Sequence, residues 1–363
     1  MNIALFGTGQ MGHAIAHMIK KLGDHFITTF DIENPSPTLE TDRHIKFRAI
    51  SIGNHNDPDF KNDETFDLII SSLPYNVSLP VAKAAIKSKI LYCDLGGSVP
   101  TSNKINQMAE ENNATVFTDL GLAPGWANIM AEEAYHEMLE TPIEVKIRCG
   151  GIPARKVPEA VDPFNYRPTW SVQGLYNEYV DDCEILIDGE FKKIPPLKET
   201  EYVRIQSSKL ESFTIEYLEA FTTSGGISHT LNLMKDRGVY NCSYKTLRYQ
   251  GHRDFVSYFL EQRKFNATQL GALFRDDHRK FDDVVIVDVE ATSTNDKYRK
   301  TNLVRVKDGY SAMQRATSGG LVAAIFACLE DNPNINSLNR PLGYQDVPVS
   351  LFNTLLNELE IHE

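Results

Sequence analysis

The chain has 363 residues, of which 42% are hydrophobic and 24% charged, as in an ordinary soluble globular protein. This length exceeds one typical domain, so we expect two domains. The formal net charge of -12, from 37 Lys and Arg against 49 Asp and Glu, disfavours a nucleic-acid or membrane-surface partner.

The sequence shows no pattern typical of a membrane or secreted protein. Its longest apolar run, residues 321–329, is far shorter than the ~20 residues that span a bilayer. The chain starts with a short apolar run in place of a signal peptide, so we expect a cytoplasmic protein without a membrane partner. The five cysteines form no CxxC pair and the ten histidines no HExxH motif, so we predict neither a disulfide framework nor a metal site.

The first glycines of the chain have the spacing of a dinucleotide-binding turn. Residues 2–6 form an apolar run too short for a helix, and residues 13–22 carry apolar side chains at helical intervals. Between them, Gly7, Gly9 and Gly12 match GxGxxG. The first glycine would make the turn, the second would let the backbone approach a pyrophosphate, and the third would let the helix pack on the strand. The order of strand, turn and helix therefore predicts a Rossmann site.

An acidic residue follows at the position that selects the cofactor. Residues 26–32 are predicted to form a second strand, and Asp31 near its end lies nineteen positions after Gly12. This is close to the ~20 residues expected for the carboxylate that binds the adenosine ribose. No Arg or Lys follows in residues 32–37, and Asp31 would repel a 2′-phosphate, so we expect NAD rather than NADP. A strand-end turn residue is the alternative role of Asp31.

Alternating strands and helices continue to residue 125. This alternation predicts an α/β fold, with a doubly wound parallel sheet in a domain of residues 1–125 that a C-terminal helix rejoins near 311–363. After the two strands already described, we predict strands at 44–50, 66–72, 90–95 and 115–120, and helices at 77–87 and 103–112.

Leu73 and Pro74 directly follow the strand predicted at 66–72. Residues at the carboxyl ends of such strands line the nucleotide crevice, although Pro74 could merely start the next helix. The helix N-terminus at Gln10 and Met11 would face the phosphates. The predicted cofactor-binding residues are Gly7, Gly9, Gln10, Met11, Gly12, Asp31, Leu73 and Pro74.

The pattern changes after residue 125. Successive short strands without long helices between them predict a second, α+β domain of residues 126–310, built on an antiparallel sheet and used for substrate binding and oligomerisation. Ser311 is a candidate cap for the apolar helix predicted at 313–330. We predict strands at 145–149, 184–187, 191–194, 218–222 and 243–249, a hairpin of 282–292 and 301–307, and helices at 128–138, 255–262 and 267–274.

Seven short segments, in order along most of the chain, resemble one known family. They are SLPYNVSLPVAKAAIKS at 72–88, CDLGG at 93–97, DLGLAPG at 119–125, CGGIP at 149–153, TSGGIS at 223–228, YKTLRYQGH at 244–252 and AMQRAT at 312–317. The first three are similar to the saccharopine dehydrogenase-like oxidoreductases, and the last four to their lysine 6-dehydrogenase branch.

This resemblance implies an NAD-dependent enzyme that oxidises the terminal amine of an amino acid. For L-lysine the products would be 2-aminoadipate 6-semialdehyde and ammonia. Related members, such as saccharopine and carboxynorspermidine-type reductases, form or cleave secondary amines, so the substrate could be an amino acid or a polyamine. A nucleotide-binding sensor that kept the fold and lost catalysis is an alternative of another class. Most soluble oligomers are symmetric homo-oligomers, and we expect a homodimer or homotetramer.

Removal of a hydride from a carbon that bears an amine requires a neutral amine, so a side chain must accept the amine proton. Asp94 and Asp119 are candidates, because each ends a predicted strand beside a glycine turn, where the crevice lies. Bracing those turns is their alternative role. His252 is a third candidate, since an unperturbed histidine titrates near neutrality.

Arg248 is the best candidate for binding a substrate carboxylate, because a guanidinium grips this group with two parallel hydrogen bonds. A solvated or structurally paired arginine is the alternative. Thr223 and Ser224, before a glycine pair, could present hydroxyl and N–H groups to the same carboxylate or form an ordinary turn. Tyr166 and Trp170 could wall the pocket and exclude water, or simply belong to the core.

Overall fold

The computed structural model describes residues 1–33, 42–52, 58, 65–156, 162, 164–205, 217–274 and 282–362. It divides into two compact units, the first formed by Met1–Ile129 with Ala316–Ile361 and the second mainly by Met130–Arg315. The predicted limits at 125 and 311 lie near these divisions. Residues 34–37, on which the argument for NAD partly rests, lie outside the described residues.

The first unit combines parallel strands with helices. Its strands are β1 (Asn2–Phe6), β2 (Phe26–Asp31), β3 (Ile45–Ala49), β4 (Leu68–Ser71), β5 (Leu91–Asp94) and β6 (Val116–Phe117). Its helices are α1 (Gln10–Leu22), α3 (Tyr75–Ser88), α4 (Val99–Glu111), most of α10 (Ala312–Asp331) and α11 (Val349–Glu358), with short 3-10 turns η2 (Ile335–Leu338) and η3 (Tyr344–Asp346).

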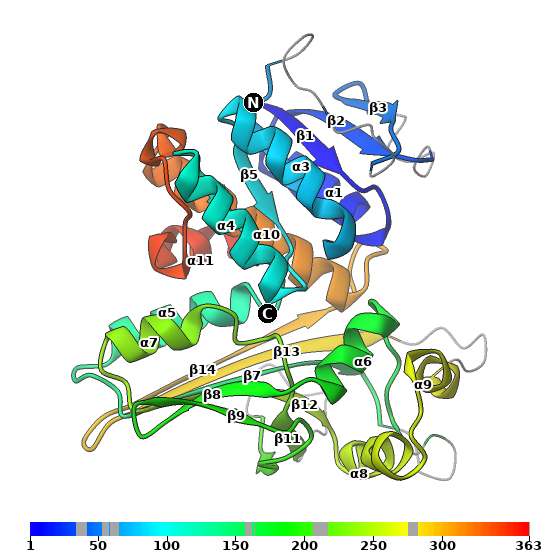
Figure 1. Cartoon of the computed structure of the whole chain (residues 1–363), viewed down its shortest axis with the longest axis vertical. Coiled ribbons are helices and arrows are strands. Elements are labelled where there is room, and N and C mark those ends of the chain that lie inside the picture. The colour runs from blue at the N-terminus through cyan, green and yellow to red at the C-terminus, as the bar shows by residue number, and fades with distance from the viewer. Residues whose placement is uncertain are drawn as a thin grey trace. The chain divides into compact units, whose positions relative to one another are not determined.

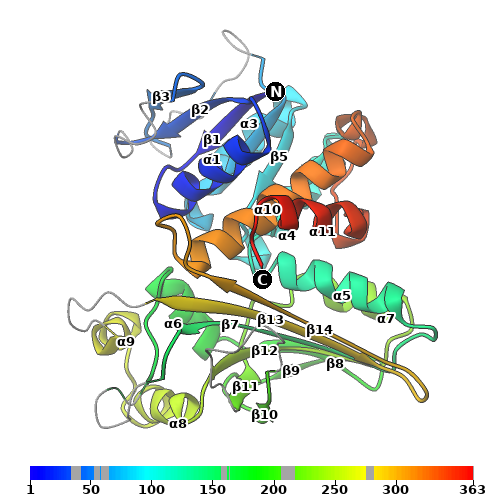
Figure 2. The same ribbon diagram turned by 180° about the vertical axis from the view of Figure 1, so that it is seen from behind.

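These six strands form one sheet in the order β3-β2-β1-β4-β5-β6, which is the Rossmann order. All the pairs are parallel, with Asn2 beside Phe26 and Ile3 beside Leu68. The helices α3 and α4 lie on one face of the sheet, and α1 and α10 on the other (Figure 1, Figure 2). Cover on both faces explains why β1 and β4 are almost continuously apolar. The predicted doubly wound α/β fold is confirmed.

The strand β6 is shorter than the predicted strand at 115–120. It spans only Val116–Phe117 and is followed two residues later by Asp119, whose φ of 63° lies in the left-handed region. An extended chain cannot continue through such a residue. The chain therefore leaves the extended conformation before Gly121, earlier than the apolar pattern of residues 115–120 predicts.

The helix α10 begins with the predicted cap. The Ser311 hydroxyl accepts a hydrogen bond from the Gln314 N–H (3.1 Å), and the Gln314 side chain accepts one from the Ser311 N–H (2.9 Å). Among the described residues, α10 alone is long and apolar enough to cross a membrane by length and composition, but 78% of its apolar window is buried inside the protein. Burial of this extent is typical of a core helix.

The second unit contains a larger sheet and several short helices. Its strands are β7 (Glu144–Pro153), β8 (Cys183–Ile187), β9 (Glu190–Ile194), β10 (Glu201–Val203), β11 (Leu218–Thr222), β12 (Asn241–Tyr249), β13 (Asp283–Thr292) and β14 (Lys297–Arg305). Its helices are most of α5 (Trp126–Glu137), α6 (Val172–Val180), α7 (Thr230–Asp236), α8 (His252–Ser257), the π-helix η1 (Tyr258–Gln262) and α9 (Ala267–Phe274).

The sheet order is β10-β11-β12-β7-β13-β14, with β8 paired to β12 and β9. The β13–β14 hairpin is confirmed, and the sheet is antiparallel as predicted except at its centre, where β7 and β12 are parallel. A parallel pair needs a long crossover connection, usually with a helix. The chain between β7 and β12 contains α6 and α7. Neither helix was predicted from the sequence.

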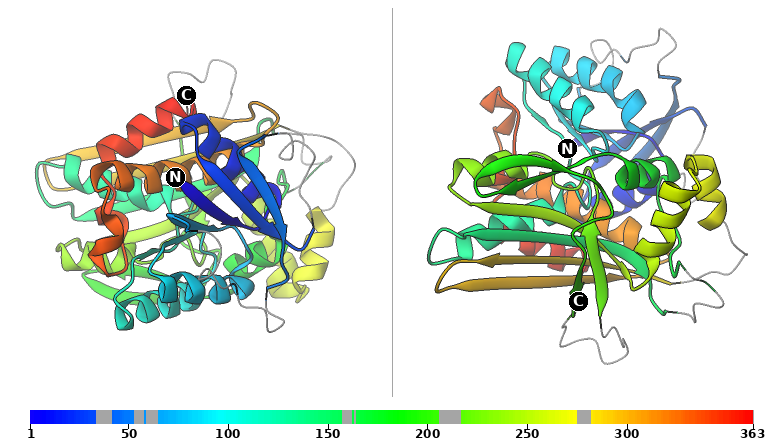
Figure 3. Two further views of the ribbon diagram at one scale, coloured as in Figure 1. Left: turned by 90° about the horizontal axis from the view of Figure 1, so that it is seen from above. Right: turned by 60° about the horizontal axis from the view of Figure 1, so that its bottom comes forward.

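The helices α6, α8 and α9 gather at one end of this sheet (Figure 1, Figure 3). A largely aromatic core lies among them and reaches Phe221 on β11. Side chains alternate between the two faces of a strand, so Arg248 and Thr246 of β12 share one face. Arg248 contacts α6 through Tyr179, which places this face of β12 toward the aromatic core.

Candidate functional site

The glycine turn after β1 has the geometry that its sequence predicts. Gly7 has a φ of +88°, in a region that side chains rarely adopt, and its N–H donates to the Phe30 carbonyl (2.8 Å). A Cβ atom added at Gly12 would overlap the carbonyl oxygen of Gly7. Turn and helix packing therefore require glycine at both positions.

Gly9 differs from Gly7 and Gly12 because a Cβ atom added there would meet none of the described residues within 4 Å, apart from its own chain neighbours. The helix α1 begins immediately after it, with Gln10 exposed and Met11 half-buried, and the first turn contains no acidic side chain. The first N–H groups of a helix lack partners within the helix and favour an anion. Open space over Gly9 beside this helix end fits the diphosphate of a dinucleotide.

Asp31 ends β2 and braces the same turn. One carboxylate oxygen accepts hydrogen bonds from the N–H (2.6 Å) and the hydroxyl (2.9 Å) of Thr8, and the other accepts from the Ile32 N–H (2.7 Å). The side chain is half-buried, so it remains reachable by a ligand. Asp31 thus has the turn role left open as an alternative, and its contact with a ribose stays a prediction.

Leu73 and Pro74 lie at the carboxyl end of β4, next to the end of β1. The Ser72 hydroxyl, which the sequence did not single out, interacts with the carbonyls of Phe6 (3.1 Å) and Gly7 (2.8 Å) and ties the two strand ends together. Leu73 packs on the core, whereas Pro74 is exposed directly before α3. All the predicted cofactor residues therefore lie at the carboxyl ends of three adjacent strands.

Asp94 and Asp119 are joined to each other. One oxygen of Asp94 accepts from the N–H groups of Gly96 (2.9 Å) and Asp119 (3.0 Å), and the other accepts from the Tyr92 hydroxyl (2.9 Å). The Ser102 hydroxyl donates to Asp119 (2.6 Å). Burial, followed by the charge of Asp119, raises the pKa of Asp94 to about 7. Both carboxylates brace turns, which is the alternative role given to them from the sequence. Their contact with a substrate amine stays a prediction.

Arg248 lies on β12 and is only 3% exposed. Its Nε donates to the Tyr179 hydroxyl (3.2 Å), its Nη1 donates to the Leu247 carbonyl (2.9 Å), and its guanidinium lies 4.2 Å from the centre of the Tyr166 ring. Within the described residues, no carboxylate oxygen lies within the 4.0 Å of an ion pair with Arg248. The guanidinium of Arg248 is therefore a buried cation without an ion-pair partner among the described residues.

Arg248 stays positively charged despite its burial. Burial by itself lowers the pKa of Arg248, but Tyr179, Tyr166 and Glu178 more than offset this effect and raise it. The side chain of Tyr166 is buried, and its hydroxyl accepts a hydrogen bond from Trp170 Nε1 (3.2 Å). Tyr166 and Arg248, predicted separately as substrate-binding residues, are therefore in direct contact.

His252 lies behind Arg248 in a hydrogen-bonded chain. Its Nδ1 is 2.9 Å from the Phe164 carbonyl, which can only accept, so Nδ1 carries the hydrogen and Nε2 accepts from the Tyr179 hydroxyl (3.0 Å). The Tyr179 oxygen in turn accepts from Arg248. This order leaves His252 neutral in a single tautomer.

The expectation that His252 titrates near neutrality is wrong. The ring is completely buried among aromatic side chains, including Phe221 and Phe274, which stack with it. Burial and then the charge of Arg248 lower the pKa of His252 to about 3. His252 positions Tyr179 and, through it, Arg248.

Thr223 and Ser224 are used by the protein itself. The Thr223 hydroxyl is 2.7 Å from that of Thr246 on β12. The Ser224 hydroxyl donates to the Asn177 carbonyl (3.2 Å) and its N–H donates to the Glu178 carbonyl (3.1 Å), so Ser224 satisfies the last carbonyls of α6. These contacts resemble the turn alternative, and binding of a substrate carboxylate by either residue stays a prediction.

Two residues of this site, Glu178 and Tyr179, were missed because α6 was not predicted. The signal was present, since Val172, Leu175, Tyr176 and Tyr179 have the helical spacing i, i+3, i+4 and i+7. The Ser171 hydroxyl also accepts from the Gly174 N–H (3.2 Å) and caps the helix.

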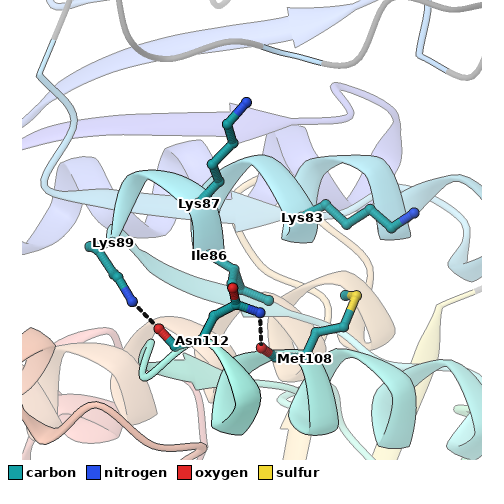
Figure 4. A pocket seen from close by; sticks show the side chains of 6 residues that line it. All are labelled: Lys83, Ile86, Lys87, Lys89, Met108 and Asn112. Carbon is teal, nitrogen blue, oxygen red and sulfur yellow. Dashed lines mark hydrogen bonds between the residues drawn. The ribbon is translucent and has the colours of Figure 1, made fainter.

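A shallow pocket elsewhere in the first unit contains none of the predicted site residues. It lies between α3 and α4, and Lys89 donates there to the Asn112 carbonyl, while Asn112 donates to the Met108 carbonyl (2.8 Å) (Figure 4). The side chains of Lys83 and Lys87 point away from Asn112. Its lining contains three lysines but no acidic side chain and none of the predicted site residues, so this pocket is not the candidate site.

Two family models match the chain in succession. The saccharopine dehydrogenase NADP binding domain matches residues 3–122, and the saccharopine dehydrogenase C-terminal domain matches residues 121–336. The chain belongs to the saccharopine dehydrogenase family. Membership confirms the resemblance seen in the seven sequence segments and assigns a nucleotide-binding domain to the first unit, whereas the lysine 6-dehydrogenase branch is not decided by it.

Known relatives agree with this family. Mitochondrial alpha-aminoadipic semialdehyde synthase of Rattus norvegicus is 28% identical over 193 residues, which cover 52% of this chain and 20% of the relative. The saccharopine dehydrogenase [NADP(+), L-glutamate-forming] of Pyricularia oryzae is 32% identical over 132 residues, covering 35% of this chain and 29% of the relative. The chain therefore spans less than a third of the length of these two relatives.

A solved structure supports the fold over the whole chain. Apo saccharopine dehydrogenase (L-Glu forming) from Saccharomyces cerevisiae has a TM-score of 0.68 and 15% identity, with 99% of this chain and 98% of that chain covered. The N-terminal family description and the name of the Pyricularia relative both specify NADP, so the comparisons do not support the expectation of NAD.

Proposed function

We propose that the protein is an amino-acid oxidoreductase that acts on a carbon–nitrogen bond with a nicotinamide dinucleotide. The observation that carries this proposal is the buried Arg248, held by Tyr179 and Tyr166 without a carboxylate within 4.0 Å among the described residues. A charged group taken out of water is costly unless it is paired, so a carboxylate ligand would stabilise this arrangement. Membership of the saccharopine dehydrogenase family supports the same chemistry.

The reaction has a definite balance of atoms. The substrate ammonium group first loses a proton, and the carbon of the neutral amine then loses a hydride, which gives an iminium; water adds to the iminium, and ammonia leaves together with a proton to give an aldehyde. The bound dinucleotide supplies the hydride acceptor. Arg248 holds the substrate carboxylate, and the apolar surfaces of Tyr166 and Trp170 exclude water from it. Asp94 remains the first candidate proton acceptor, because its pKa of about 7 suits proton transfer near neutrality.

Two substrates are supported by different observations. The four later sequence segments favour L-lysine, whose oxidation would give 2-aminoadipate 6-semialdehyde and ammonia. The names of the relatives favour saccharopine, whose secondary amine would be cleaved with release of glutamate. Lysine is our first candidate, since the segments around Arg248 belong to the set that favours it.

We propose NAD as the preferred cofactor because of Asp31. Its carboxylate ends β2 beside the glycine turn, where it would repel the 2′-phosphate of NADP. A ribose hydroxyl can still donate to an oxygen that already accepts from protein, since each carboxylate oxygen has two lone pairs.

A substrate panel tests reaction and cofactor together. The purified protein should reduce NAD with L-lysine and release ammonia in equal amount, at a kcat/KM at least ~10-fold above that with NADP, a difference of about 1.4 kcal/mol. Release of glutamate from saccharopine, with no ammonia from lysine, would replace the first candidate with the second. Binding of NAD without turnover of lysine, ornithine or saccharopine would favour the silent sensor and reject the enzyme.

We further propose a cytoplasmic protein that works as a homodimer or homotetramer. Light scattering of the purified protein should give a mass two or four times that of one chain. A single-chain mass at micromolar concentration contradicts this proposal.

A further inference from the structure

Glu178 directly precedes Tyr179, whose hydroxyl holds Arg248, and its charge affects the pKa of Arg248 although the two form no ion pair within 4.0 Å. Glu178 lies on α6, and its side chain is half-buried. Among the described residues, its carboxyl group has neither a hydrogen bond nor an ion pair, although its main-chain carbonyl accepts from Ser224. Its oxygens are not sealed from solvent, since they are absent from the completely buried atoms that lack a partner. The carboxyl group is thus near a cation, partnerless and reachable.

Three contacts fix Arg248, and none of them involves the Glu178 side chain. The Tyr179 hydroxyl holds Nε, the Leu247 carbonyl holds Nη1, and the Tyr166 ring supports the plane of the guanidinium. Glu178 and Arg248 nevertheless affect each other, because each shifts the pKa of the other. If the pair existed only for stability, direct contact at less than 4.0 Å would serve better.

Among the described residues whose pKa is shifted, those that interact with Glu178 carry no charge besides that of Arg248. Those close enough to interact electrostatically are Arg248 and Tyr244 on β12, Cys149 on β7, Cys183 on β8, Tyr179 on α6 and Tyr166. All except Arg248 are neutral at pH 7, since burial raises the pKa of each tyrosine and cysteine. One cation and one acid, held apart among neutral groups, match a ligand that carries both charges.

We propose that Arg248 and Glu178 form a subsite for the zwitterionic end of an α-amino acid, in which Arg248 binds the carboxylate and Glu178 binds the ammonium group. This assignment rests on the proposed function and narrows its substrate class. A free α-amino acid end would be required in addition to the reacting amine. Monocarboxylates, diamines and polyamines each lack one of the two charges.

Ligand binding at this subsite should change the protonation state of Glu178. Burial raises the pKa of Glu178 to about 8, against the smaller opposing effect of Arg248. The free protein therefore holds Glu178 mostly protonated at pH 7, whereas an ammonium ligand favours the ionised form. Binding of an α-amino acid at pH 7 should release a proton, and binding at pH 9 should not.

Titration calorimetry without cofactor tests the subsite independently of turnover. L-Lysine, 6-aminohexanoate, which lacks the α-ammonium group, and pentane-1,5-diamine, which lacks the carboxylate, are titrated into wild type, Glu178→Gln and Arg248→Lys. We expect Glu178→Gln to lower the affinity for lysine at least ~10-fold and to change the affinity for 6-aminohexanoate less than ~2-fold. Arg248→Lys should weaken both ligands, because it loses the bidentate contact with the carboxylate.

A matched control is Glu184→Gln, which removes an exposed acid of β8 and should bind lysine like wild type. If Glu178→Gln lowers the affinities for lysine and 6-aminohexanoate equally, the subsite is rejected. It is also rejected if neither affinity falls. If no α-amino acid among lysine, ornithine, glutamate and saccharopine binds to wild type, the subsite is also rejected. Turnover of lysine with unchanged KM in Glu178→Gln would reject the subsite and leave the proposed function standing.

Wild type alone provides a second measurement should Glu178→Gln fail to fold. The enthalpy of lysine binding at pH 7 should vary between buffers of different ionisation enthalpy, whereas that of 6-aminohexanoate should not. Buffer-independent lysine binding at pH 7 would contradict the assignment.

Discussion

Gly9 and Gly12 stand three residues apart in one turn, but their surroundings differ. Around Gly9 there is space for a side chain, and no atom of the described residues fills that space. At Gly12 the space is already occupied by the backbone of Gly7. The fold therefore requires glycine at position 12, whereas the glycine at position 9 leaves space for the predicted ligand.

Alanine at these two positions should separate binding from stability. Gly9→Ala should alter the free energy of unfolding by less than ~1 kcal/mol, yet weaken NADH binding at least ~10-fold, because its methyl group occupies the phosphate site. Gly12→Ala should lower the free energy of unfolding by about 2 kcal/mol or more through overlap with the backbone. Urea unfolding and fluorescence titration with NADH measure the two effects. Unchanged NADH affinity in Gly9→Ala would remove the dinucleotide site from this turn.

The raised pKa of Glu178 predicts how stability depends on pH. Its pKa is about 8 in the folded protein against about 4.5 when unfolded, so the folded state binds more protons in this interval and loses stability as pH rises from 4.5 through 8. Glu178→Gln lacks this loss. Its free energy of unfolding should match wild type near pH 5 and exceed it above pH 8, on the order of 1 to 3 kcal/mol. A difference that is constant between pH 5 and 8.5 would contradict the pKa shift.

Among the elements, α10 depends for its start on a residue from a distant strand. Asp283 of β13 accepts hydrogen bonds from the N–H groups of Ala312 (2.7 Å) and Met313 (3.0 Å), two donors that the helix itself cannot satisfy. Ser311 provides the local cap, and Asp283 completes it from outside. Asp283, Ala312 and Met313 all belong to the second unit.

Removal of this distant cap should destabilise the protein. Asp283→Ala should lower the free energy of unfolding by about 1 to 2 kcal/mol, since two buried N–H groups lose their acceptor. The neighbouring exposed Asp282 provides the control, and Asp282→Ala should stay within ~0.5 kcal/mol of wild type. Urea denaturation of the three proteins gives the comparison. Equal stability of both variants would show that water replaces the cap without loss.

The central strands of the second unit show where local pattern is insufficient. Both β7 and β12 have the composition of a strand, and both were predicted close to their positions. Their parallel pairing depends on the crossover that contains α6 and α7. A period of two places side chains on a face but carries no information about the direction of the neighbouring strand.

At the scale of the whole molecule, each ligand should act first on its own unit. NAD alone should slow amide exchange at residues 7–13, where the diphosphate meets the turn. An α-amino acid alone should slow exchange in α6 and β12, which hold Glu178 and Arg248. Hydrogen exchange with mass spectrometry measures both effects, because a bound ligand stabilises the segments that contact it against opening. Protection of α6 and β12 but not residues 7–13 by NAD would reverse the assignment.

The sequence alone determined the first unit and the family. The buried strands, the helices between them and the glycine turn are encoded by neighbouring residues, so spacing and apolar period were sufficient. The family motifs are equally local, which is why Arg248 and Tyr166 could be selected before any contact was known.

Only the tertiary structure decided what surrounds those residues. Burial made His252 a neutral positioning residue, turned Asp94 and Asp119 into braces, and brought Glu178 of α6 near Arg248 of β12. Each outcome depends on desolvation and on charges contributed by segments distant in the chain. Such energies arise when the elements pack together, so no local pattern of residues can encode them.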